Sequence, residues 1–204
     1  MRERIPINLA VEDTLSGAIL RRILIATGRP FEVGTCYQRH GFGYLKRTII
    51  WLNSAARGTP FVVLTDLDTG TCAPDLITDW LRIPRHPNLI FRVAVREVEA
   101  WVLADRRGFA EFAGVREKVV PRDPEAVANP KQRLIAIVAR SRYRSLRQDI
   151  VPRQGNTAQQ GPNYNAPLIG FVQDRWDPLA AQLHCDSLRR AINRLRTFRP
   201  TRAK

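Results

Sequence analysis

Short apolar runs alternate with helical patterns over the first 112 residues of the chain. The expected strands are IPINLAV (5–11), FEVGTCY (31–37), PFVVLTDLD (60–68) and NLIFRVAV (88–95). The segments that follow them repeat apolar positions at helical spacing, which predicts helices over 15–28, 43–58, 73–83 and 97–112. Strands separated by such helices require parallel crossovers. The pattern therefore predicts an α/β fold with a mainly parallel sheet of about four strands flanked by helices.

The pattern changes after residue 115. Helical stretches are expected near residues 131–141, 167–176 and 185–198, with a polar loop, QDIVPRQGNTAQQGPNYNAP, between the first two. A loop of that length in a compact domain is usually functional or disordered. We therefore divide the chain into an α/β core over residues 1–115 and a basic, mainly helical extension over 116–204 that packs on the core.

The chain is strongly basic: it carries 33 Lys and Arg against 19 Asp and Glu, a net charge of +14. The surplus is concentrated in residues 133–204, which hold 14 basic and 4 acidic residues. Such a balance suggests a polyanionic partner, although an arginine-rich proteome would also raise surface charge. If the partner is nucleic acid, the candidate contacts are Lys131, Arg189, Arg190, Arg194 and Arg196.

The sequence also bears on the compartment. No apolar stretch approaches the roughly 20 residues of a membrane span, and MRERIPINLAVED lacks the apolar core of a signal peptide. We therefore expect a cytoplasmic protein without a membrane partner. Cys36, Cys72 and Cys185 are far apart and not at zinc-ligand spacing, so they are expected to be buried thiols.

Acidic residues follow three of the four expected strands. Because the carboxyl ends of parallel strands form the ligand crevice of such a sheet, these side chains are expected to cluster: Glu12, Asp66, Asp68, Glu97 and Glu99. Carboxylates a few ångströms apart cannot all ionise without a cation, and a hard divalent cation such as Mg²⁺ or Mn²⁺ resolves this. Acids at the crevice with arginines around it suggest metal-assisted phosphodiester chemistry.

Each acid also has a structural interpretation. Asp66 or Asp68 could be a helix cap or a turn residue. Glu97 and Glu99 could simply complement the dipole of the helix in whose first turn they lie, although we favour Glu97 over Glu99 as a ligand. Lys131 could contact a phosphate or be a solvated surface residue.

The motifs LAVED and LTDLD resemble the TOPRIM domain of topoisomerases, primases and OLD-family nucleases, over about residues 5–112. More narrowly, VREVEAWVLAD is similar to a segment of the TOPRIM-like DUF4276 family, found in bacterial phage-defence loci beside an ABC-type ATPase. That similarity extends loosely over NPKQRL and GPNYN. The resemblance implies a divalent-metal-dependent nuclease that acts on DNA or RNA with an ATPase partner.

The resemblance also implies roles for the acids. Glu12 would act as general acid or base, and Asp66, Asp68 and either Glu97 or Glu99 would hold Mg²⁺. The family usually has glycine after its first glutamate, whereas this chain has Asp13. The side chain of Asp13 either adds a ligand or crowds the turn.

Two other functions remain open. VVLTDLDTGT looks like the first motif of haloacid-dehalogenase-like phosphotransferases, in which the first aspartate is a nucleophile and the second a general acid. That function requires a later acidic pair, for which the chain offers only Asp174 and Asp177. The third possibility is a non-catalytic subunit with a degenerate TOPRIM core that binds nucleic acid or a partner protein.

Overall fold

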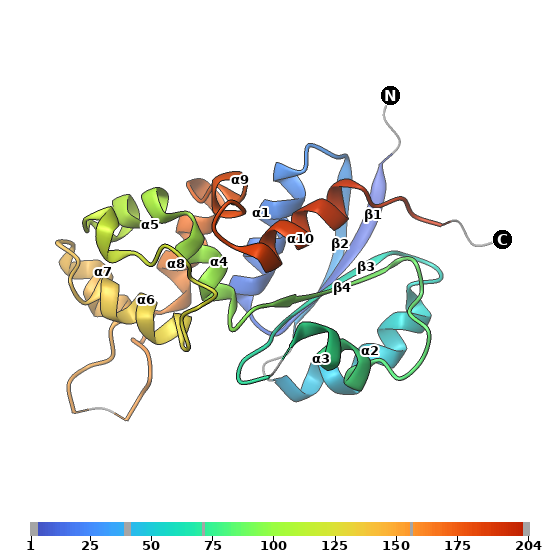
Figure 1. The fold of residues 1–204 in the computed structure, drawn as a ribbon, viewed down its shortest axis with the longest axis horizontal. Coiled ribbons are helices and arrows are strands. Elements are labelled where there is room, and N and C mark those ends of the chain that lie inside the picture. Colours follow the sequence, from blue (N-terminus) through green and yellow to red (C-terminus); the bar gives the residue numbers. More distant parts are fainter. Residues whose placement is uncertain (1–3, 39–41, 71, 156, 202–204) are drawn as a thin grey trace.

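The computed structural model describes residues 4–38, 42–70, 72–155 and 157–201 of the chain (Figure 1). The strands are β1 (Ile5–Val11), β2 (Phe31–Gln38), β3 (Phe61–Asp66) and β4 (Leu89–Ala94). The helices of the first half are α1 (Thr14–Ala26), α2 (Phe42–Ala55), α3 (Ala73–Trp80), α4 (Val98–Ala104) and α5 (Arg106–Ala113). Those of the second half are η1 (Glu117–Val119), α6 (Pro130–Val138), α7 (Arg144–Ile150), α8 (Asn165–Asp174), α9 (Pro178–Ala181) and α10 (Asp186–Arg196).

Within the described residues the four strands form one parallel sheet in the order β2-β1-β3-β4. Val11 lies opposite Leu64 on β3, and Asp66 lies opposite Ala94 on β4. The predicted α/β fold with a four-stranded parallel sheet flanked by helices is confirmed. β2 pairs with one edge of β1, and β3 pairs with the other edge of β1. The strand order therefore reverses between β1 and β3. In open α/β sheets this reversal opens the ligand crevice.

Both faces of the sheet are covered, which explains the continuous apolar run in β3. Val62 and Leu64 pack into the cluster that contains α1, whereas Phe61 and Val63 pack into a second cluster with α2 and α3. Figure 1 shows α1 and α10 on one face of the sheet and α2 and α3 on the other. Alternate side chains of one strand therefore stabilise two separate layers.

The helices after residue 115 pack against the first half of the chain. α8 lies against α1, and α10 lies against β4 and α1. The indole N–H of Trp101 in α4 donates to the hydroxyl of Ser187 in α10 at 2.7 Å, and that of Trp176 donates to the carbonyl of Trp101 at 3.2 Å. In Figure 1, α4 to α9 lie beside the carboxyl ends of the strands. Helices from both halves of the chain therefore lie near the strand ends that carry the acidic residues.

Two expectations about helices are wrong in detail. The helix expected over 97–112 is split at Asp105, whose carboxylate accepts the N–H of Gly108 at 3.0 Å and so caps α5. The same carboxylate accepts the N–H of Asp177 at 3.0 Å, so a tertiary contact fixes the break. The polar loop expected from residue 148 also begins too early, because α7 continues to Ile150, which is buried with Leu146 one turn away.

The cysteines differ from expectation as well. Cys185 is buried, but Cys36 and Cys72 are only partly buried, so the prediction of three buried thiols is wrong for two of them. Cys36 lies on the edge strand β2, and Cys72 lies just before α3. In the part of the chain that the structure describes, no helix has the length and apolar character needed to cross a membrane.

Candidate functional site

Glu12 follows β1 directly and is held against the neighbouring strand β3. The hydroxyl of Thr65 donates to Oε1 of Glu12, and the backbone N–H of Asp66 donates to the same oxygen at 3.2 Å. Burial raises the pKa of Glu12, and the charges of Asp68 and Asp13 act in the same direction. The glutamate after the first strand and the aspartate after the third are therefore neighbours at the reversal of strand order.

Asp66 ends β3 in the middle of the acidic residues. Its Oδ1 accepts the N–H of Val98, the first residue of α4, at 3.0 Å. Burial raises the pKa of Asp66 well above its usual range, and the nearby carboxylates of Glu99 and Glu12 raise it further. The charge of Asp66 is thus opposed both by loss of water and by like charges.

Asp68 lies two residues further on, in the loop after β3. It is exposed, and its backbone has a left-handed φ of 50°. Its N–H donates to the carbonyl of Arg96 at 2.8 Å, which ties this loop to the segment after β4. Partial loss of hydration of its carboxylate raises the pKa of Asp68, while the positive charge of Lys131 lowers it.

Glu97 and Glu99 lie at the beginning of α4, at different depths. Oε2 of Glu97 accepts the backbone N–H of Lys131 at 2.8 Å, so this side chain joins α4 to α6. Glu99 is only 4% exposed and accepts the hydroxyl of Tyr164 at 2.9 Å. Burial, supported by the charge of Glu97, raises the pKa of Glu99 to about 7 against the opposing effect of Lys131.

Lys131 and Tyr164 come from the second half of the chain and complete this cluster. The Nζ atom of Lys131 lies 4.9 Å from the centroid of the Tyr164 ring. These two residues belong to NPKQRL and GPNYN, the segments over which the DUF4276 resemblance extends. Residue patterns alone pointed to Lys131 but missed Tyr164 and Thr65. For Tyr164 the resemblance was the available signal, whereas no signal marked Thr65.

The side chain of Asp13 does not crowd the turn after β1, and the backbone at this position does not require glycine. Its backbone is extended, with φ of −143°, a conformation that any residue adopts. Its Oδ1 accepts the N–H of Ser16 at 2.7 Å, so Asp13 is the N-cap of α1. Asp13, at the position where the TOPRIM resemblance implies glycine, therefore has a local structural role as a helix cap.

The predicted arginines lie on α10 rather than beside the acids. Arg189 and Arg190 both form ion pairs with Asp186, the second at 2.5 Å. Arg194 donates to the carbonyl of Pro87 at 3.3 Å, and Arg196 is exposed. The structure therefore brings Glu12, Asp66, Asp68, Glu97, Glu99 and Lys131 together and leaves the arginines on a separate helix.

The cluster consists of oxygen donors, which suits a hard divalent cation. The hydrogen bonds of Glu12, Asp66, Glu97 and Glu99 each engage one carboxylate oxygen, and a carboxylate can accept with both. Among the described residues, however, no three His, Cys, Asp or Glu side chains converge as a preformed metal site. The ligand type thus fits Mg²⁺, but the side chains would have to adjust around it.

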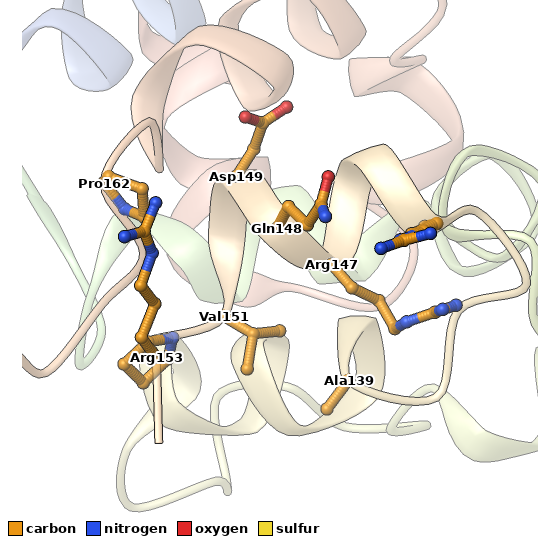
Figure 2. A pocket seen from close by; sticks show the side chains of 9 residues that line it. Ala139, Arg147, Gln148, Asp149, Val151, Arg153 and Pro162 are labelled. Atoms are coloured by element: carbon orange, nitrogen blue, oxygen red, sulfur yellow. The ribbon is translucent and has the colours of Figure 1, made fainter. Parts of the chain in front are cut away.

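A cavity of about 760 Å³ lies elsewhere, beside α7. Figure 2 shows Arg147, Gln148 and Asp149 of α7 around it, with Arg153 opposite. None of the clustered carboxylates lines this cavity. We assign the candidate site to the carboxylates because the chemistry of the side chains, rather than volume, identifies it.

Comparisons with known proteins identify no relative of this chain. No protein-family model matches the chain, and neither a curated protein nor a solved structure matches it. The resemblance to TOPRIM domains therefore depends on the motifs alone.

Proposed function

We propose that this protein is a divalent-metal-dependent nuclease that acts on phosphodiester bonds of DNA or RNA. The observation that carries the proposal is the contact of Glu12 with Thr65 and with the backbone of Asp66. This contact joins the ends of β1 and β3 where the strand order reverses, which is the ligand crevice of an open parallel sheet. A glutamate and an aspartate from adjacent strands at that position are the acids that the TOPRIM resemblance requires.

Asp66 and Asp68, with Glu97 or Glu99, would hold Mg²⁺ or Mn²⁺. Their raised pKa values support this assignment, because each carboxylate is charged only at a cost that a nearby cation would remove. When bound, the metal supplies Lewis-acid stabilisation of a phosphoryl oxygen and activates water. Lys131 adds a fixed positive charge beside Asp68 and Glu97.

Glu12 would serve as the general acid or base. Its raised pKa brings the exchange of its proton closer to neutral pH, where such a group is most effective. The hydrogen bonds from Thr65 and Asp66 hold Oε1 of Glu12 at the carboxyl end of β3. Positioning of this kind limits the motion that proton transfer would otherwise require.

Cleavage of labelled single-stranded and double-stranded DNA and RNA with Mg²⁺, Mn²⁺ or EDTA tests the proposal. We expect metal-dependent cleavage that is lost in Asp66→Asn and reduced about 100-fold or more in Glu12→Gln. Asp75→Asn, an exposed acid in the first turn of α3, is the matched control and should cleave normally. Cleavage that survives in both site variants would exclude this site as the catalytic one.

By the same resemblance we propose a role in bacterial phage defence with an ABC-type ATPase as partner. Activity that is silent in the isolated protein would then appear when the ATPase is added. The Asp66→Asn variant in the presence of that partner separates cleavage by this chain from cleavage by a contaminant.

One observation favours a second candidate, a non-catalytic subunit that binds nucleic acid or a partner protein. Asp66 and Glu97 each cap a neighbouring helix, and the described carboxylates do not form a preformed metal site. Calorimetric titration with Mg²⁺ and Mn²⁺ discriminates the two functions. A binding subunit would retain nucleic acid in EDTA and show neither metal binding at Asp66 nor cleavage.

The phosphotransferase alternative has less support in the geometry. It requires a second pair of acids near Asp66, and the groups that raise the pKa of Asp66 are Glu99, Glu12, Asp13 and Asp68. Asp177 instead caps α9 by accepting the N–H of Leu179 at 2.8 Å. Asp174 lies at the end of α8.

A further inference from the structure

A cavity of about 390 Å³ lies along the outer strand β4, between α3 and α10. Phe91, Val93 and Val95 of this strand and its continuation form an apolar side, and three arginines give it positive charge: Arg92, Arg96 and Arg190. We call this cavity the β4 groove. None of the clustered carboxylates lines this groove, which combines apolar surface with guanidinium groups.

Arg92 is half-buried in the β4 groove. Its Nε donates to the carbonyl of Phe91 at 2.9 Å, and no described carboxylate forms an ion pair with it. Burial, together with the charges of Arg85, Arg194 and Arg190, lowers the pKa of Arg92 to about 10. Four guanidinium groups around one half-buried position repel one another, so an anion bound there would be stabilised by all of them.

The two acids that line the groove are already engaged. Glu125 accepts the N–H groups of Asp186 and Ser187 at 2.7 and 3.0 Å, which caps the beginning of α10. Asp186 is shared between Arg189 and Arg190. Neither carboxylate is paired with Arg92 or Arg96, so the positive charge of the groove is only partly compensated.

The groove begins at the candidate site. Leu67, which separates Asp66 from Asp68, is one of its lining residues. The guanidinium of Arg96 donates to the carbonyls of Asp68 and Gly70 at 3.1 and 3.4 Å. A chain molecule lying in the groove would therefore reach the loop that carries the acids.

We infer that the β4 groove binds the sugar-phosphate backbone of a single-stranded nucleic acid and leads the strand to the carboxylate cluster. The arginines match phosphate groups, and the apolar side matches nucleobases, as in other single-strand channels. The cavity has the volume of a small-ligand cleft, which is too small for a double helix. Delivery of the strand to the carboxylate cluster rests on the proposed nuclease function, whereas binding in the groove does not.

A matched pair of variants tests the binding. Arg189 and Arg190 share Asp186 and carry the same charge, but only Arg190 is among the residues that line the groove. Binding of a fluorescent single-stranded DNA or RNA oligonucleotide is measured by anisotropy in EDTA over a range of salt. Arg190→Ala should bind about tenfold more weakly, with a log–log salt slope shallower by about 0.7.

Arg189→Ala should retain most of the affinity and the wild-type slope. Equal losses in the two variants would overturn the inference, since general surface charge would then explain binding. Equal affinity of the wild type for single strands and for duplexes of the same length would also contradict it. Both measurements are independent of cleavage, so they stand even when the nuclease proposal fails.

A second measurement uses cysteines as reporters within one protein. Cys72 lines the groove, whereas Cys36 lies on β2 at the opposite edge of the sheet, and both are partly buried. We expect a single-stranded oligonucleotide to slow maleimide modification of Cys72 several-fold and to leave Cys36 unchanged, as read by mass spectrometry. Bound oligonucleotide that leaves Cys72 unprotected would place the strand elsewhere. Protection of Cys72 without any metal-dependent cleavage would support the groove and contradict only the nuclease proposal.

Discussion

Asp68 and Arg96 hold each other by two hydrogen bonds across the ends of β3 and β4. The N–H of Asp68 donates to the carbonyl of Arg96 at 2.8 Å, and the Arg96 guanidinium donates to the carbonyl of Asp68 at 3.1 Å. Both residues have left-handed backbones, with φ of 50° and 62°. Such conformations are costly for side chains other than glycine and are often retained at functional sites. This pair connects the candidate metal ligand Asp68 with the β4 groove.

Two substitutions of Arg96 separate backbone strain from the guanidinium contacts. Arg96→Ala and Arg96→Gly both remove the side-chain hydrogen bonds, but only glycine relieves the left-handed conformation. We expect the glycine variant to be more stable than the alanine variant by about 1 kcal/mol. Urea unfolding of the two proteins measures the difference. Equal stabilities would mean that the position carries no backbone strain.

Asp68→Asn should retain the fold and respond less strongly to metal. Asparagine tolerates the left-handed conformation as aspartate does, so the free energy of unfolding in EDTA should not fall. The substitution removes one charged oxygen ligand, so the rise in melting temperature on addition of Mg²⁺ or Mn²⁺ should shrink. Asp75→Asn is the control and should keep the full rise. An Asp68→Asn protein with an unchanged metal response would remove Asp68 from the ligand set.

The sequence predicts the sheet and the acidic edge well, because both depend on local patterns. β1 occupies the residues expected from IPINLAV, and the parallel order makes Glu12 a neighbour of Asp66. The sequence does not predict the hydrogen bond between Tyr164 and Glu99, because it joins residues 65 positions apart in the chain. The Asp105 break in the helix after β4 also depends on a distant partner, Asp177.

Glu99 should make the metal-free protein less stable as the pH rises. Its pKa in the folded protein is about 7, against an ordinary value of 4.5. Between these values the folded protein retains a proton that the unfolded chain has lost. The contribution of Glu99 to the free energy of unfolding is therefore greatest below pH 4.5. This contribution falls by about 3 kcal/mol as the pH rises to 7.

Urea unfolding in EDTA across this pH range measures the effect of Glu99. Other acids of the cluster also have raised pKa values, so the contribution of Glu99 is the difference between the wild type and Glu99→Gln. The Gln variant should lose stability less steeply between pH 4.5 and 7. Parallel curves for the two proteins would show that Glu99 titrates alike in the folded and unfolded states.

Asp13 should affect the stability of α1 and not the binding of metal. As the N-cap of α1 its carboxylate accepts the N–H of Ser16, and replacing such a cap by alanine typically costs about 1 kcal/mol. Asp13→Gly should cost less, since glycine is a tolerated cap residue. Both variants should keep the metal-induced rise in melting temperature. Loss of that rise in Asp13→Ala, with stability unchanged, would instead make Asp13 a ligand.

Lys131 should stabilise the protein without metal and weaken metal binding. Its positive charge lowers the pKa of Asp68, Glu97 and Glu99, so it offsets part of the repulsion among them. In Lys131→Met this compensation is lost, and the free energy of unfolding in EDTA should fall by about 1 kcal/mol at pH 8. A divalent cation would no longer be repelled by the ammonium group, so the stabilisation by Mg²⁺ at that pH should increase. Lys131→Arg, which keeps the charge, should resemble the wild type in both measurements. If Lys131→Met changes neither quantity but weakens oligonucleotide binding, the lysine contacts a phosphate and does not compensate the carboxylates.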